Sequence, residues 1–302
     1  MGSPSGLWTS VSGGLAQSQN ADIIANNLAN ANTVGFKKDT PTFKEYLTVN
    51  ERPVSPNVDI PRTIFKESDF FHLNGQEHAL VNLDRVHTDH TQSALKLTNS
   101  PLDLAIDGNG FFAVKTPSGL AFTRAGDFKV DGQGRVVTSG GHPLLAVGAP
   151  PEELKAEPGR EPAAFNPFTQ PLTPPPGKPP ALQELNVSDV IASGRKITIS
   201  EDGKVYAGDE QVGTLAIAEF VDPRLLQKTT TTLYANPNAA NVPKLAQNET
   251  KVKQGFLEMS NVNSVTELME LLKANRLFES NMRAIRTYNE MAGKEANEVG
   301  KL

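Results

Sequence analysis

Heptad spacing typical of packed helices marks both ends of this 302-residue chain, whereas the residues between them follow other patterns. Near the N-terminus, small and apolar residues recur at alternating gaps of four and three: Leu7, Val11, Gly14, Ser18, Ala21, Ala25 and Leu28. Near the C-terminus the same gaps connect Leu268, Leu271, Asn275, Phe278, Met282, Ile285, Asn289 and Ala292. Such seams predict helices that pack along other helices. The chain must therefore bring its own two ends together or supply each end with partners from elsewhere.

Local signals place the ends of these two predicted helices. The N-terminal helix, within residues 1–36, should stop near Gly35, because glycine readily adopts the left-handed conformation that follows a helix. Ser264 and Glu267 have the spacing of a capping box just before the C-terminal apolar run. We therefore predict a C-terminal helical segment within 258–302, which forms a coiled-coil layer with the N-terminal helix.

The middle of the chain has the pattern of short strands. Apolar or alternating runs are separated by glycine-containing turns, which is typical of successive hairpins. We assign residues 101–221 to an antiparallel β domain that holds a proline-rich insertion at 150–180. Residues 37–100 and 222–257 lack a clear period and are predicted to be extended connectors. The predicted fold class is α+β. The N- and C-terminal helices form a coiled-coil layer, and the extended connectors lead to a central antiparallel all-β domain.

The two end helices are poorly equipped to stand alone. Five asparagines lie between Asn20 and Asn32, which lowers the helix propensity of the N-terminal segment. Burying one stripe of a helix against a single partner barely offsets the entropy lost when the backbone becomes ordered. We infer that each helix needs several neighbours, more than one chain supplies. An intramolecular helical hairpin that caps the β domain is the alternative.

Composition excludes several classes of function. A net charge of −5 without long runs of one sign argues against nucleic-acid binding, which needs a concentrated basic face. Apolar runs reach only strand length, so we expect no membrane insertion. The first 20 residues have no secretory signal pattern, and the chain contains no cysteine. This combination is compatible with export through a dedicated route rather than by a cleavable signal.

Motifs that could support chemistry are weak. Residues 108–113 fit a dinucleotide-binding glycine pattern, but a strand-like run follows where that motif needs a helix. The loops at Asp107 and Asp131 lack the later acidic ligands of calcium loops and fit turns better. Four histidines at 72, 78, 87 and 90 have no helix to fix a metal-binding spacing. We predict no catalytic residues, no cofactor and no metal, and the remaining alternative of another class is a carbohydrate-binding or hydrolytic β domain.

Four segments resemble the flagellar basal-body rod and hook family, in the order expected for it. Residues 24–37, IANNLANANTVGFK, are similar to the N-terminal signature of these proteins. Residues 102–112 and 122–128 resemble the central β motif, and residues 254–263 resemble the segment before the C-terminal helix. The resemblance does not extend to the proline-rich segment at 150–180.

The resemblance implies a structural subunit rather than an enzyme. Family members are exported through the flagellar type III export apparatus without a cleaved signal peptide. Their end helices stack with copies of themselves and with neighbouring rod proteins, which locates the protein in the basal body and its periplasmic rod. Within the family, the run from Arg276 to Ile285 is most similar to proximal-rod subunits, followed by distal-rod and then hook subunits. The implied subunit interface comprises Leu7, Val11, Asn26, Asn27, Leu28, Leu268, Leu271, Asn275, Phe278, Met282 and Ile285.

Overall fold

A computed structural model describes residues 5–47, 79–147, 168, 182–188, 190, 194–238, 240–245 and 250–299. The chain divides into two units. The helical unit comprises residues 1–29, 39–87 and 263–302, and the β unit comprises residues 30–38 and 88–262. The proline-rich segment predicted at 150–180 lies outside the described residues, apart from Phe168.

The helices are α1 (Ser5–Ala29) and α3 (Ser264–Val299). The strands are β1 (Asp39–Leu47), β2 (Ala79–Thr88), β3 (Leu95–Leu97), β4 (Leu104–Asp107), β5 (Phe111–Thr116), β6 (Gly119–Thr123), β7 (Lys129–Val130), β8 (Val136–Val137), β9 (Leu145–Val147), β10 (Leu182–Glu184), β11 (Ile197–Ile199), β12 (Lys204–Ala207), β13 (Glu210–Leu215), β14 (Ile217–Glu219), β15 (Gln227–Lys228), β16 (Leu233–Ala235), β17 (Lys244–Leu245), β18 (Lys251–Gln254) and β19 (Phe256–Glu258), with a short 3-10 turn η4 (Pro223–Leu225). The α+β class predicted from the sequence is confirmed.

Local hydrogen bonds mark the start of α3 and the end of α1. The N-terminus of α3 is capped by Asn263, whose Oδ1 accepts hydrogen bonds from the backbone N–H groups of Val265 and Thr266 at 3.1 and 3.2 Å. The predicted cap at Ser264 was therefore one residue late. After α1 the chain turns, and the Thr33 N–H donates to the Asn30 carbonyl at 3.1 Å. The helix ends at Ala29, which includes the whole heptad pattern up to Leu28 but is earlier than the predicted stop near Gly35.

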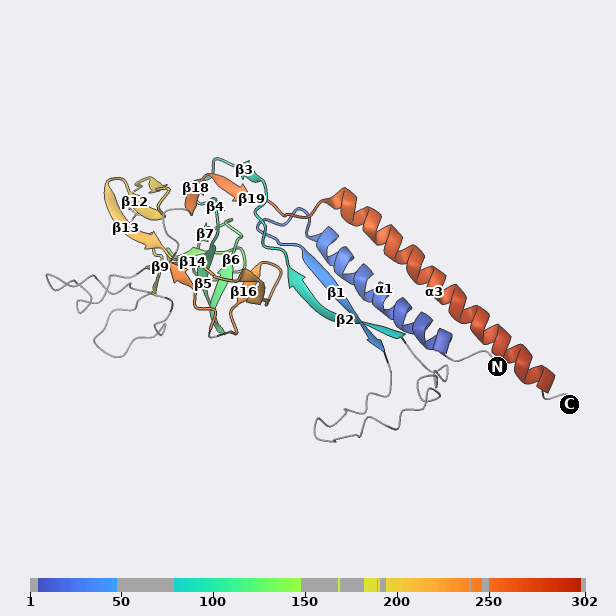
Figure 1. The fold of residues 1–302 in the computed structure, drawn as a ribbon. Coiled ribbons are helices and arrows are strands. Elements are labelled where there is room, and N and C mark those ends of the chain that lie inside the picture. Colours follow the sequence, from blue (N-terminus) through green and yellow to red (C-terminus); the bar gives the residue numbers. More distant parts are fainter. Residues whose placement is uncertain are drawn as a thin grey trace, which may run out of the picture. The chain divides into compact units, whose positions relative to one another are not determined.

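The helical unit contains α1, α3 and the two-stranded sheet β1–β2 (Figure 1). The helices lie side by side and run in opposite directions (Figure 1). Strand β2 lies against α1, and the Val81 N–H donates to the Ser12 hydroxyl at 3.3 Å. The prediction of an extended connector over 37–100 therefore has to be corrected at 39–47, 79–88 and 95–97, where the chain forms strands. The part of that predicted connector at 48–78 lies outside the described residues.

The β unit is built around a six-stranded sheet in the order β15-β16-β6-β5-β14-β17 and a five-stranded sheet in the order β10-β9-β13-β12-β11. Side chains alternate between the two faces of a strand. On β5, Phe112 and Val114 therefore join one apolar cluster, whereas Phe111 and Ala113 join another. Strand β5 is thus covered on both faces, which explains its continuous apolar run.

The predicted return connector at 222–257 also needs correction, because it contributes five strands to the β unit. Strand β16 pairs with β6, and β17 pairs with β14, so both extend the six-stranded sheet. Strands β18 and β19 pair with β4 and β3. These strands are two to four residues long, too short for an alternating pattern to be visible in the sequence. Four of them, β16 to β19, pair with strands far away along the chain, and these partners determine their conformation.

Candidate assembly interface

The two helices pack where their side chains are small. A Cβ atom built on Gly13 would lie 3.3 Å from Nδ2 of Asn281, and one built on Gly14 would lie 3.7 Å from the Asn281 Cβ. Glycine at this crossing therefore lets the α3 side chain approach the α1 backbone closely. The small residues that the N-terminal seam contains thus serve close packing within the helical unit.

The predicted seam of α3 is divided between two environments. Leu271, Phe278 and Ile285, seven residues apart, are half-buried. Leu268, Asn275 and Met282, also seven residues apart, are exposed. Because residues seven apart lie on the same side of a helix, one edge of the predicted seam is covered within the chain and the other edge is open.

The predicted residues of α1 also differ in their surroundings. Leu7 and Leu28 are half-buried, whereas Val11 and Asn26 are exposed. Asn27 is only 1% exposed. Its Nδ2 donates to the Asp39 carbonyl at 2.8 Å, and its Oδ1 accepts from the Asp39 N–H at 3.0 Å. Asn27 therefore holds strand β1 against α1 within the chain, and its assignment to a subunit interface stays a prediction.

Several exposed apolar residues were missed by the seam. On α1, Trp8 and Leu15 are 55% and 58% exposed. On α3, Val265, Met269 and Leu272 are 68%, 68% and 52% exposed. A search for heptad spacing finds one apolar stripe on each helix. Apolar residues on another face of the same helix are therefore missed. Counting apolar residues on every face would have found these side chains.

The β unit contains a buried ion network that connects the segments used for the family resemblance. Nζ of Lys37 lies 2.7 Å from Oε1 of Glu258, and both side chains are fully buried. Nη1 of Arg124 lies 3.3 Å from Oε2 of the same carboxylate and is also buried. Lys37 donates to the Thr91 carbonyl at 2.6 Å, and the Ser93 N–H donates to Glu258 at 2.9 Å. One carboxylate thus joins residues from three distant parts of the chain.

Burial dominates the electrostatics of this network. Removal from water lowers the pKa of the Lys37 ammonium, and the Glu258 carboxylate opposes that change. Burial likewise lowers the pKa of the Arg124 guanidinium, again against the influence of Glu258. Because the three charged groups are buried together, removing one of them would leave the others without their partner in the interior.

His90 lies beside this network. Its ring makes edge-to-face contacts with Phe111 and Tyr234, at centroid distances of 5.3 and 5.1 Å. Among the described residues, neither ring nitrogen has a hydrogen-bond partner. Burial lowers the pKa of His90 to about 4, and the nearby cations Lys37 and Arg124 lower it further. The ring is therefore neutral in the folded protein near pH 7.

Acidification should destabilise the β unit through His90. An unfolded chain binds a proton at this ring near pH 6.5, whereas the folded chain binds it only near pH 4. Protonation of His90 therefore does not affect the free energy of unfolding above about pH 6.5. Below that pH it lowers the free energy of unfolding, by up to about 3 kcal/mol as the pH approaches 4. His90→Phe should flatten this part of the profile, as measured by urea unfolding between pH 7 and pH 4.5. The control is His87→Phe at an exposed position; equal slopes in the parent chain and His90→Phe would contradict the prediction.

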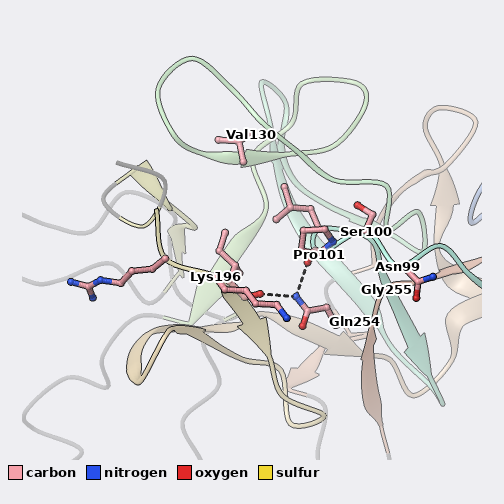
Figure 2. Close-up of a pocket in the computed structure, with 10 residues that line it drawn as sticks. Asn99, Ser100, Pro101, Val130, Lys196, Gln254 and Gly255 are labelled. Atoms are coloured by element: carbon pink, nitrogen blue, oxygen red, sulfur yellow. Dashed lines mark hydrogen bonds between the residues drawn. The ribbon is translucent and has the colours of Figure 1, made fainter. Parts of the chain in front are cut away.

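A groove of about 520 Å³ opens on the surface of the β unit (Figure 2). Gln254 spans it, donating from Nε2 to the carbonyls of Pro101 and Ile197 at 2.7 and 3.1 Å. Its Oε1 accepts from the Ile199 N–H at 3.1 Å. The charged lining residues are Arg195 and Lys196, and none of the described residues that line the groove is a carboxylate or a histidine. The lining therefore offers no acid–base pair, and Gln254 acts there as a bridge between strands.

The weaker sequence motifs have structural explanations. A strand, β5, follows the glycines at 108 and 110, so the dinucleotide-binding reading is excluded. Asp131 accepts backbone hydrogen bonds from Gln133 and Arg135 at 2.9 Å, which confirms its predicted role in a turn. Within the described ranges, no three metal-binding side chains gather, and no helix has the length and apolar character needed to cross a membrane.

Three family models match the chain. "Flagella basal body rod protein" matches residues 7–37, which contain α1 and the first part of the buried network. "Flagellar hook protein FlgE/F/G D1 domain" matches residues 105–207. "Flagellar basal body rod FlgEFG protein C-terminal" matches residues 253–299, which include Glu258 and α3. The matches cover both helices and a large part of the β unit.

Named relatives are similar over nearly their full lengths. The flagellar basal-body rod protein FlgG of Bacillus subtilis is 30% identical over 298 residues, covering 96% of this chain and 97% of the relative. FlgG of Borreliella burgdorferi is 30% identical over 303 residues, covering 95% and 96%. FlgF of Mesorhizobium japonicum is 27% identical over 285 residues, covering 93% and 91%. The chain therefore belongs to the family of flagellar basal-body rod proteins, which are structural proteins and not enzymes.

Proposed function

We propose that this protein polymerises through α1 and α3 into the axial rod of the flagellar basal body, where the rod transmits torque to the filament. The observation that carries this proposal is the apolar surface on both helices. Val265, Leu268 and Met269 are each about half or more exposed within the first two turns of α3. Contiguous apolar surface of this kind marks sites that other proteins cover.

The helices would form a coiled-coil layer in the assembled rod. In this arrangement the half-buried edge of α3, at Leu271, Phe278 and Ile285, packs within the chain. The open edge, at Leu268 and Met282, packs against neighbouring subunits. Two edges at heptad spacing support this view, because a helix in a multi-stranded layer has partners on more than one side.

The subunit could belong to the proximal or to the distal part of the rod. The sequence analysis favours the proximal rod, on the run from Arg276 to Ile285. The relatives from Bacillus subtilis and Borreliella burgdorferi, both 30% identical, are FlgG proteins, and the FlgF relative is 27% identical. These identities support the runner-up prediction, the distal rod. Expression in strains that lack either FlgF or FlgG would decide, because only the strain whose subunit is replaced should regain swimming.

Export and location follow from the same proposal. The subunit would be exported through the flagellar type III apparatus without a cleaved signal and join copies of itself and other rod proteins in the periplasmic rod. The family membership supports this route. Intact mass measurement of the assembled protein tests it, because signal cleavage would shorten the chain at its N-terminus.

Leu271→Asp should abolish assembly and swimming. The substitution places a carboxylate on the half-buried edge of α3, where it loses water without gaining a partner. The β unit should remain folded, since Leu271 belongs to the helical unit. Motility in soft agar and sedimentation of the purified chain measure the effect.

The matched control is Leu271→Met, which keeps an apolar side chain of similar volume and should assemble normally. Thermal unfolding of the β unit should be the same in the parent chain and both variants. Normal swimming in the Leu271→Asp strain would argue decisively against polymerisation through these helices.

A further inference from the structure

Two separate apolar patches lie on the helical unit. The α1 patch consists of Trp8, Val11 and Leu15, which are 55%, 40% and 58% exposed. Their spacing of three and four places them on one side of α1. The α3 patch consists of Val265, Leu268, Met269 and Leu272, which are 49% to 68% exposed and share one side of α3.

Each patch faces away from the packed side of its own helix. In α1 the buried residues include Ala16 and Ile24, and in α3 they include Glu267 and Ala274. At 100° per residue, the centres of the patches lie roughly opposite these buried positions on a helical wheel. Neither patch is therefore used by the contact between α1 and α3 within the chain.

The patches also lie at opposite ends of the helical pair. The helices are antiparallel (Figure 1). The side chain of Asn281 lies against Gly13 and Gly14, so these positions are level along the two helices. The α1 patch is thus level with residues slightly beyond Asn281, whereas the α3 patch is in the first turns of α3. At 1.5 Å per residue, the patches are separated by about 20 Å along the helix axes.

Resting on the proposed function, we infer that the α1 patch of one copy docks onto the α3 patch of the next copy, with an axial offset of about 20 Å. Two different patches form a heterologous contact, which repeats without closing. When both copies point the same way, α1 of one copy runs antiparallel to α3 of the other. Leu15 then lies opposite Val265, and Trp8 lies opposite Leu272.

The size of the patches favours a second copy within an assembly over an isolated dimer. Each patch exposes on the order of 300–400 Å² of apolar surface, the size at which such patches mark interaction sites. Joining them removes about 700 Å² from water, below the roughly 1,200 Å² of a stable pairwise interface. The α1 patch also adds no unpaired charge, because the only ionisable residue between Ser5 and Ala29 is Asp22. The contact is therefore weak in a dimer and gains strength when each copy uses both of its patches.

Disulfide cross-linking of the assembled full-length protein tests this contact. The chain has no cysteine, so introduced thiols report on single positions. A size-tagged Leu15→Cys chain and an untagged Val265→Cys chain are mixed, assembled, pelleted and oxidised. Mixed covalent dimers should form at least about fivefold more than in a control with Leu272→Cys as the partner, because a disulfide needs closely spaced backbones. Both positions are exposed, and circular dichroism checks that the variants fold.

The outcomes separate this inference from the proposed function. No pelletable assembly of the parent chain would remove the proposed function, and the contact with it. Assembly in which the 15–265 link is absent, or in which 265–265 or 15–272 links predominate, would overturn the contact alone. In an independent test, Met269→Asp should reduce the pelleted fraction severalfold without changing the melting temperature, because the side chain is 68% exposed. Unchanged assembly of that variant would also overturn the inference.

Discussion

Glu258→Ala should lower the stability of the β unit by about 3–5 kcal/mol, because it leaves two buried cations without their shared partner. Lys37 and Arg124 lie 2.7 and 3.3 Å from its two carboxylate oxygens, and all three side chains are at most 3% exposed. The Ser93 N–H would also lose its acceptor. Small domains are stable by only about 5–15 kcal/mol, so the variant should unfold at a much lower urea concentration.

The control for this prediction is Glu201→Ala. Glu201 also forms a close ion pair, with Nζ of Lys251 at 2.8 Å, but both side chains are mostly exposed. Because water already solvates both charges, the urea midpoint should hardly change. Similar losses in the two variants would show that burial does not set the contribution of the Glu258 pair.

Gly35→Ala should destabilise the β unit by at least about 2 kcal/mol, for two independent reasons. The backbone of Gly35 has φ of +66°, a conformation that L residues rarely adopt. A Cβ atom there would also lie 2.3 Å from the backbone nitrogen of Ala125, so the backbone would have to move. Such a shift would strain the adjacent hydrogen bond from the Gly35 N–H to the Glu258 carbonyl, now 2.8 Å long.

Two further glycine variants separate these causes. Gly141 has φ of +80° but no atom within 4 Å of its added Cβ, so Gly141→Ala measures the backbone cost alone. Gly132 has neither a positive φ nor a close neighbour, so Gly132→Ala should have little effect. Urea midpoints should fall in the order Gly132→Ala, Gly141→Ala, Gly35→Ala. A Gly35→Ala midpoint equal to that of Gly141→Ala would show that the close approach to Ala125 costs nothing.

The sequence was a good guide wherever the signal is local. The strand-like run that the sequence shows in the glycine pattern at 108–113 corresponds to β5, and the turn at Asp131 forms with the expected side-chain hydrogen bonds. Periodicity and turn chemistry act over a few residues, so they are visible in the chain itself. Strands such as β17 and β19 escaped prediction because they have two and three residues, and each pairs with a strand that is far away along the chain.

The candidate assembly interface was likewise predictable where the signal is local and unpredictable where it depends on tertiary packing. By itself the sequence determined that both ends are helical, that each carries apolar side chains at heptad spacing, and that the middle is β. The tertiary structure alone decided which seam residues remain open, because exposure depends on which face another element covers. It turned Asn27 inward onto Asp39, left Leu268 outside, and brought Lys37 to Glu258 across 221 residues of sequence. Helical period is a property of neighbouring residues, whereas burial and ion pairing are properties of the packed chain.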